Sequence, residues 1–174
     1  MKRLVILFSV LVLMAGFSVN LLAQATENTA AAANIVIPIA ISETASLHFG
    51  TMAVLAGTGG TCVLSTQGVR SQTGGVNLSV QTPTATNAAF SVSGAVSTTY
   101  AITLPATITV SYLTNNMTIG TLLARTASAG ANGLTGTLSG AGADTFTVGG
   151  TLAVTAGQVA GLYTGTFDVT VAYN

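Results

Sequence analysis

Apolar and polar residues alternate near the C-terminus of the chain. Four apolar residues occupy every second position there: Phe167, Val169, Val171 and Tyr173. Successive side chains of a β-strand point to opposite faces, so these four share one face. The pattern predicts a strand whose apolar face is buried in a sheet. The neighbouring strands of that sheet come either from the same chain or from another copy.

The same alternation recurs along the chain at spacings near ten residues. Its apolar positions are Ile35, Ile37, Ile39, Ile41; Leu47, Phe49; Cys62, Leu64; Val76, Leu78, Val80; Phe90, Val92; Tyr100, Ile102, Leu104; Ile108, Val110, Tyr112; Phe146, Val148; and Leu152, Val154. Turn signals separate these segments at residues 57–60, 74–75, 114–116 and 149–150. Many short strands with short connections predict an all-β, antiparallel sandwich or barrel.

Residues 126–142 depart from this pattern. They are almost entirely alanine, glycine, serine, threonine and leucine. Small side chains bury little area, so we expect a long loop or a weakly packed hairpin here.

The N-terminus has the features of a secretory signal peptide. Lys2 and Arg3 precede an apolar run over residues 4–17, and Ala23 and Ala25 fit a small-x-small cleavage site. We expect residues 1–25 to be a cleaved signal peptide, with an uncleaved membrane anchor as the alternative. The predicted domains are then an N-terminal extension or first strand at 26–41 and a β-sandwich at 42–174. No transmembrane segment is expected after cleavage.

Charge is scarce in the expected mature chain. It has no lysine, and its only cations are Arg70 and Arg125. Nucleic-acid binding needs clustered basic residues, so this class of function is excluded. Soluble monomers usually carry roughly a quarter to a third charged residues on their surface. A surface this poor in charge favours an assembly in which much of it is covered.

Residues that could carry chemistry are few and scattered. His48 is the only histidine, and alternation predicts that it is exposed on a strand, with no nucleophile motif beside it. Cys62 is the only cysteine, so no internal disulfide forms, and a buried apolar role is favoured over an intermolecular bond. Asp144 and Asp168 form no recognisable ligand or acid–base pattern. We therefore expect no catalytic, metal-binding or cofactor-binding residues, and no enzyme.

Several sequence blocks in a fixed order resemble an exported bacterial family catalogued as domain of unknown function 4402. The blocks are Leu47-His-Phe-Gly50, Gly74-Gly-Val-Asn-Leu78, Phe90-Ser-Val-Ser-Gly94, Tyr100-Ala-Ile-Thr-Leu-Pro105, Phe146-Thr-Val-Gly-Gly-Thr-Leu152 and Gly161-Leu-Tyr-Thr-Gly-Thr-Phe167. The resemblance covers nearly all of the mature chain. It implies a secreted β-domain and brings no activity with it.

The C-terminal block is also similar to that of pilins assembled by the chaperone–usher route. Those subunits end in an alternating strand with a glycine near its start and an aromatic residue next to last, positions held here by Gly161 and Tyr173. The resemblance implies an immunoglobulin-like sandwich that lacks one strand. In such pilins an extension of the next subunit fills the gap, after a periplasmic chaperone has filled it first. Such pilins usually carry a disulfide, which this chain cannot form.

The sequence offers one candidate for such a donor strand. It is the alternating set Ile35, Ile37, Ile39 and Ile41, which contains Pro38 and therefore suits an edge position. Whether this segment pairs within its own chain or with another copy stays open at this point. The candidate acceptor is the C-terminal strand with Gly161, Phe167, Val169, Val171 and Tyr173.

These patterns lead to a functional hypothesis. The chain is expected to be a fimbrial, pilin-like subunit at the cell surface, exported via the periplasm. Its expected partners are other copies or related subunits, with a chaperone and usher during assembly. The alternatives are a free-standing secreted or surface-attached β-sandwich for binding or adhesion, and a small outer-membrane β-barrel.

Overall fold

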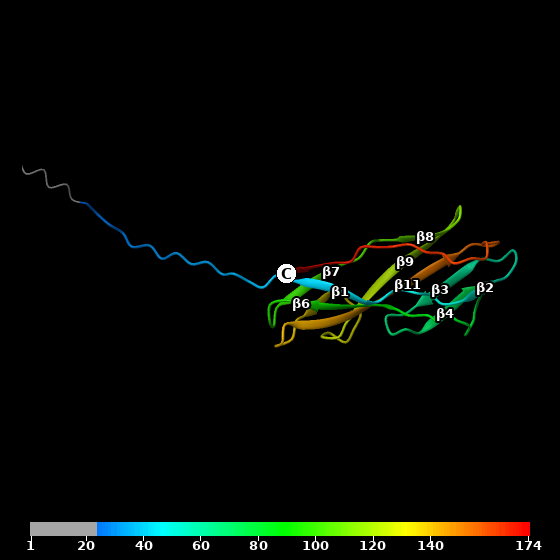
Figure 1. Ribbon diagram of the computed structural model, residues 1–174, viewed down its shortest axis with the longest axis horizontal. Coiled ribbons are helices and arrows are strands. Elements are labelled where there is room, and N and C mark those ends of the chain that lie inside the picture. Colours follow the sequence, from blue (N-terminus) through cyan, green and yellow to red (C-terminus); the bar gives the residue numbers. More distant parts are fainter. Residues whose placement is uncertain (1–23) are drawn as a thin grey trace, which may run out of the picture. The chain divides into compact units, whose positions relative to one another are not determined.

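The computed structural model describes residues 24–174, and this part of the chain consists of strands and loops without a helix (Figure 1). The prediction of an all-β, antiparallel fold is confirmed. The predicted signal peptide falls almost entirely outside the described residues. The strands are β1 (Ala40–Ala45), β2 (Met52–Val54), β3 (Gly60–Leu64), β4 (Arg70–Gly74), β5 (Val76–Leu78), β6 (Ala88–Ser93), β7 (Thr99–Thr103), β8 (Ile108–Tyr112), β9 (Asn115–Thr126), β10 (Thr135–Thr137), β11 (Ala143–Val154) and β12 (Thr170–Tyr173).

The chain divides into two units, Met1–Ile35 and Val36–Asn174. In the first unit, residues 24–35 form no secondary structure and their side chains are exposed. All described strands belong to the second unit.

Strand β11 is the centre of the largest sheet. One of its edges pairs with β9 along most of its length. Its other edge pairs first with β6 and then with β3, which lie end to end along it. The outer strands of this sheet are β1, which pairs with β6, β4, which pairs with β3, and β8, which pairs with β9.

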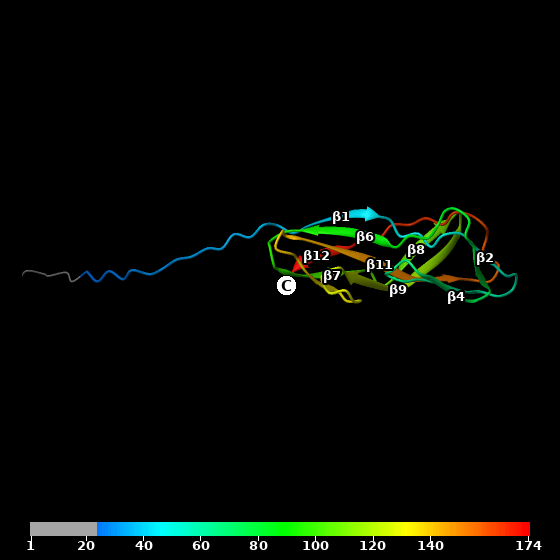
Figure 2. The same cartoon turned by 90° about the horizontal axis from the view of Figure 1, so that it is seen from below.

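Two smaller sheets complete the domain. Strand β7 pairs with β10 and β12, and β2 pairs with β5. Figure 2 shows β1 and β6 on one side of the domain and β7 and β9 on the other. Between them lie two apolar clusters. One contains Phe90 and Phe146, whose stacked rings have centroids 5.0 Å apart, and the other is built around Phe49 and Cys62.

Two local expectations from the sequence were wrong. Gly149 and Gly150 do not form a turn, because β11 runs through them without a break. At Gly149 the partner of β11 changes from β6 to β3, and a Cβ there would collide with the carbonyl oxygen of Leu64. The segment 126–142, expected to be a long loop or a weakly packed hairpin, is more tightly packed than that. It contains β10, and Leu138 is fully buried in the first apolar cluster.

Candidate functional site

The N-terminal edge of the domain is paired on one side only, from residue 40 to residue 54. Strand β1 pairs with β6, His48 exchanges two backbone hydrogen bonds with Thr86, and β2 pairs with β5. Within the described chain, no backbone hydrogen bond joins the opposite edge of this stretch to another segment. Antiparallel strands point alternate backbone groups to either side, so this edge presents N–H and C=O groups that have no backbone partner, although side chains occupy some of them near Gly50.

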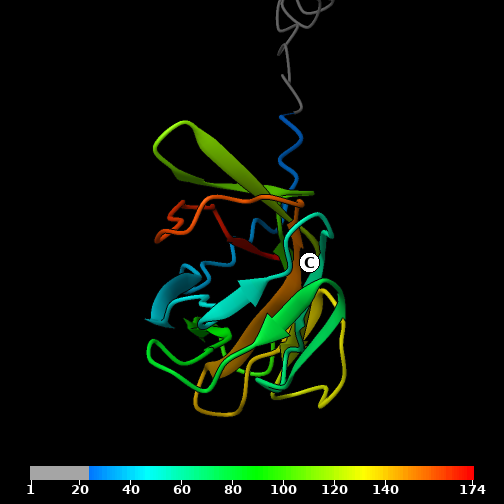
Figure 3. The same ribbon diagram turned by 90° about the vertical axis from the view of Figure 1, so that its right-hand side faces the viewer.

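The C-terminal segment faces this edge and is also incompletely paired. Thr164 exchanges two backbone hydrogen bonds with Ser111 of β8, so residues near it run beside the β8–β9 hairpin (Figure 3). Pairing resumes only at β12, on β7. Between them, residues 165–169 make no backbone–backbone hydrogen bond within the described chain. Phe167 and Val169 are nevertheless half-buried against the core.

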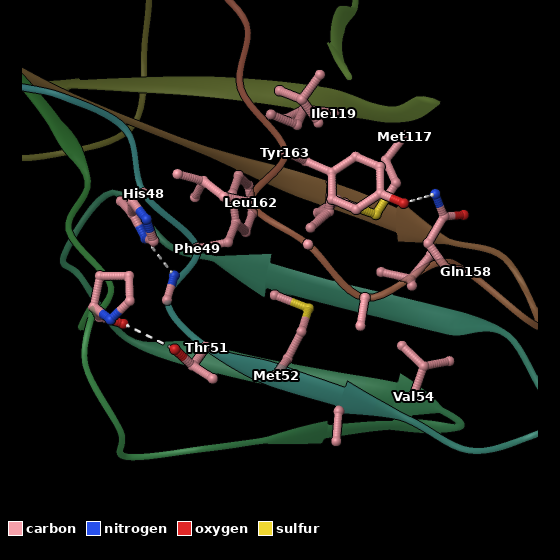
Figure 4. A pocket seen from close by; sticks show the side chains of 18 of the residues that line it. His48, Phe49, Thr51, Met52, Val54, Met117, Ile119, Gln158, Leu162 and Tyr163 are labelled. Atoms are coloured by element: carbon pink, nitrogen blue, oxygen red, sulfur yellow. Dashed lines mark hydrogen bonds between the residues drawn. The ribbon is translucent and has the colours of Figure 1, made fainter. Parts of the chain in front are cut away.

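A large cavity of about 630 Å³ opens between the two segments. One wall is formed by residues 47–54 and the other by residues 158–163, as Figure 4 shows for Met52, Val54, Leu162 and Tyr163. Between these walls, Met117 and other side chains of β8, β9 and β11 complete the lining. The lining contains no carboxylate, lysine or arginine, so the cavity suits uncharged, apolar side chains.

A smaller cavity of about 170 Å³ lies between the same two segments, beside the start of β1. Ile41 and Glu43 line it from β1, and Phe167, Asp168 and Val169 line it from the C-terminal segment. Two acidic residues, Glu43 and Asp168, are therefore among those that border it. We call the region between residues 41–54 and 158–169, with both cavities, the slot.

Arg70 holds one rim of the slot. Its guanidinium donates hydrogen bonds to the carbonyl oxygens of Phe49 (3.0 Å), Thr51 (3.1 Å) and Ser79 (2.6 Å). This fixes the turn that carries the chain from β1 into β2. His48 stabilises the same turn, because its Nδ1 accepts a hydrogen bond of 2.8 Å from the N–H of Gly50. His48 is half-buried and lines the large cavity, so the expectation of an exposed histidine was wrong.

The other rim is held by a tyrosine pair. The rings of Tyr112 and Tyr163 have centroids 5.7 Å apart, and the Tyr163 hydroxyl donates to the carbonyl of Val159 (2.8 Å). Gly161 allows this arrangement, because a Cβ there would collide with the ring of Tyr112. Close packing against Tyr112 is therefore sufficient to explain a glycine at position 161.

Tyr173 joins three distant parts of the domain. Its hydroxyl accepts a hydrogen bond from the N–H of Ala95 (2.6 Å) and donates one to the carbonyl of Ile37 (2.7 Å). Gly94 makes room for it, since a Cβ there would overlap the Tyr173 hydroxyl. The chain segment that leads into β1 is therefore tied to the last strand at Ile37.

The structure separates the four predicted donor isoleucines into two groups. Ile39 and Ile41 are partly buried and pack against the first apolar cluster of their own chain. Ile35 and Ile37 precede β1 and are 94 % and 62 % exposed. On the predicted acceptor side, Phe167, Val169, Val171 and Tyr173 all pack against that cluster.

The remaining candidate residues for chemistry do not come together. Cys62 is buried in the core, as predicted, and burial raises its pKa. Asp144 accepts hydrogen bonds from the hydroxyls of Tyr100 (2.9 Å) and Ser128 (2.6 Å) and anchors the loop after β9. Among residues 24–174, no three His, Cys, Asp or Glu side chains are grouped as metal ligands would be.

Sequence reasoning missed the large cavity and the role of Arg70. The cavity is lined by residues from loops and strands far apart in the chain, and alternation does not reveal which of them converge. Arg70 did leave a signal, because it is the only charged residue between Glu43 and Arg125. An isolated cation among apolar strands indicates a fixed structural partner.

Fold and site together define an all-β sandwich domain with a slot between its first and last segments. The chain belongs to the family described as domain of unknown function (DUF4402), whose model matches residues 39–173. No curated protein and no solved structure matched the chain. The part of the chain that the structure describes has no helix of the length and apolarity needed to cross a membrane.

Proposed function

We propose that this protein is a structural subunit of a cell-surface filament, assembled when one copy donates a strand to the slot of another. The observation that carries the proposal is the slot itself. Two incompletely paired backbone edges flank one large cavity with an uncharged lining and a smaller cavity, and Phe167 and Val169 sit beside the smaller one. An extended segment of another copy could pair with both edges and cover the exposed core.

The donor that fits this role is the exposed segment before β1. The side chains of Ile35 and Ile37 are exposed, whereas Ile39 and Ile41 are already packed in their own domain. Donation of Ile37 would replace the hydrogen bond of its carbonyl to Tyr173. Burying each isoleucine contributes about 1.5–3 kcal/mol, and each new backbone hydrogen bond contributes about 0.5–1.5 kcal/mol. Association costs about 4–15 kcal/mol, so a donated strand with several hydrogen bonds can bind with net stability.

The predicted export of the chain supports the same proposal. The predicted signal peptide would deliver the chain to the periplasm, where a chaperone would cover the slot until an usher replaces it with the next subunit. An uncovered slot would otherwise offer strand edges to any extended chain, which is an aggregation hazard. The low charge of the mature chain also suits a surface that neighbouring subunits cover.

The experiment compares the mature chain with a variant that begins at Pro38. This start removes Ile35 and Ile37 but keeps β1 intact, whereas a start at Ser42 would also remove Ile39 and Ile41 from the core. The mature chain is expected to form rods in electron micrographs and ladders in gels without heating. The shortened variant is expected to stay monomeric.

A point variant separates loss of the donor from general damage. Ile35→Asn with Ile37→Asn should abolish the rods, while Val80→Asn should not, although Val80 is as exposed as Ile35 at 94 %. If the mature chain is a stable monomer under all these conditions, strand donation is wrong. A free-standing secreted or surface-attached binding domain would then be the better account.

A further inference from the structure

The sulfur atoms of the domain are few, and two of them line the large cavity of the slot. Beyond the predicted signal peptide, the sulfur-bearing residues of the chain are Met52, Cys62 and Met117, and the chain has no tryptophan. Cys62 is buried in the core, whereas both methionines border the cavity of about 630 Å³. The accessible side chains that oxidants attack most readily are therefore concentrated in the proposed acceptor site.

The two methionines approach the cavity from different elements. Met52 begins β2 and pairs with Leu78 of β5, and Met117 lies in β9 opposite Val110 of β8. Figure 4 shows both side chains pointing into the space between the walls. Both are half-buried against the second apolar cluster, so a small molecule in solvent can reach them although their thioethers belong to an apolar lining.

We propose that Met52 and Met117 form an oxidation-sensitive switch that closes the slot to apolar strands. This inference rests on the proposed strand donation and adds a means of controlling it. The oxidant is a peroxide. The thioether sulfur attacks one peroxide oxygen, an S–O bond forms, the O–O bond breaks, and the other oxygen of hydrogen peroxide leaves as water. The sulfur loses two electrons and becomes a sulfoxide, and the peroxide gains them.

A sulfoxide is tolerated in the open slot and disfavoured in the filled one. Its oxygen accepts hydrogen bonds, which water supplies as long as the slot is open, and a donated isoleucine would displace that water. Two polar side chains of the lining have their donors engaged already. The Gln158 amide donates to the Tyr163 hydroxyl (2.8 Å) and to the carbonyl of Asn116 (3.3 Å). The Tyr163 hydroxyl donates in turn to the carbonyl of Val159 (2.8 Å).

The position of the two thioethers also determines when the switch can respond. A strand donated into the large cavity would cover both sulfur atoms and keep peroxide away from them. Free subunits would therefore respond to an oxidant, whereas assembled subunits would be protected.

The test uses an acceptor and a separate donor. The acceptor is the mature full chain with Ile35→Asn and Ile37→Asn, which is expected to be a monomer with an open slot, and the donor is a labelled peptide of residues 26–37. Fluorescence anisotropy measures binding before and after hydrogen peroxide, and mass spectrometry counts the sulfoxides. Oxidation of both methionines is expected to weaken binding at least about tenfold, the effect of burying an unpaired polar group. Methionine sulfoxide reductases for both epimers are expected to restore binding.

The matched control acceptor also carries Met52→Leu and Met117→Leu, which keep the side chains apolar and of similar volume. It retains Cys62 and so separates thioether oxidation from thiol oxidation. This acceptor is expected to bind the peptide equally well before and after peroxide. The reductase rescue makes the same separation without a variant. In rods of the parent chain, both methionines are expected to oxidise more slowly than in the monomeric acceptor.

Other results overturn the switch. These are sulfoxides that leave binding unchanged, methionines that resist peroxide in the open acceptor, an equal loss of binding in the leucine control, and a loss that accompanies unfolding in circular dichroism. In each of these cases strand donation itself stands, because the untreated acceptor binds the peptide. If no untreated acceptor binds the peptide, the proposed function and the switch both fail.

Discussion

At the scale of single residues, the structure assigns Tyr173 a larger role than a side chain on a half-buried strand. Its hydroxyl is the common partner of Ala95 and Ile37, which lie far apart in the chain. Neither bond could be inferred from the sequence, since alternation predicts the face of Tyr173 and not the partners of its hydroxyl.

Removing this hydroxyl should have a measurable cost. We expect Tyr173→Phe to lower the free energy of unfolding by about 1–2 kcal/mol, because two hydrogen bonds are lost and the Ala95 N–H loses its partner. Urea unfolding measures the change. Tyr112→Phe is the control, since the Tyr112 hydroxyl has no hydrogen-bond partner in the described chain, and it should change stability by less than about 0.5 kcal/mol. Equal losses in the two variants would contradict the role of Tyr173.

The raised pKa values of two buried groups indicate how the stability of the domain depends on pH. Burial raises the pKa of Cys62 above its ordinary value of 9.0, against a smaller opposing effect of Arg70. Burial also raises the pKa of Tyr100 above its ordinary value of 10.0, assisted by the hydrogen bond to Asp144 and the charge of Asp144. Both groups are therefore held neutral in the folded state, while the unfolded chain ionises at lower pH.

Below about pH 9 both groups are largely neutral in the folded and the unfolded chain, so they should not lower the free energy of unfolding. At higher pH they ionise in the unfolded chain first, and the free energy of unfolding should fall. The urea midpoint is expected to be lower at about pH 10.5 than at about pH 8. The double variant Cys62→Ala with Tyr100→Phe should show a smaller drop between these two conditions, whatever its stability at neutral pH. A drop as steep as that of the parent would assign the alkaline sensitivity to other groups.

At the scale of elements, alternation predicted the faces of the strands well and their pairing less well. The residues predicted to face inward at 167–173 do so, yet only β12 within that stretch has a strand partner. At the other end, the alternating isoleucines begin at Ile35, yet β1 begins at Ala40. Hydrophobic periodicity reports which side chains face the core, whereas the hydrogen bonds of the backbone depend on neighbours that a single segment cannot specify.

Glycine pairs were the other source of error. Gly74 ends β4 with a positive φ, as the predicted turn requires, whereas Gly149 and Gly150 lie inside β11. Both kinds of site need a residue without Cβ, one for a backbone angle and the other for close approach to a neighbouring strand. The sequence alone does not separate these two needs.

Arg70 connects elements, and its loss should loosen the turn between β1 and β2. We expect Arg70→Met to lower the free energy of unfolding by at least about 2 kcal/mol, because three carbonyl groups lose a charged donor. Arg125→Met is the matched control, since the Arg125 side chain makes no hydrogen bond in the described chain. Chemical denaturation compares the two. Similar small effects would show that water replaces the Arg70 guanidinium at little cost.

At the scale of the whole molecule, β11 organises the domain, and the slot separates its first segment from its last. Strand β11 joins both halves of the main sheet, and the two apolar clusters lie on either side of its midpoint. The slot is the part of this fold where the first and last segments meet without pairing. Its proposed use is the acceptance of a strand from another copy.

The position of β1 has a mechanical consequence for such a filament. The chain enters each domain at Ile37 and continues as β1, which is hydrogen-bonded along its length to β6. Tension between neighbouring subunits would pull along β1, at right angles to those hydrogen bonds. The bonds would then share the load in shear rather than open one after another, so the first strand would serve as the anchor by which each subunit resists being torn from the fibre.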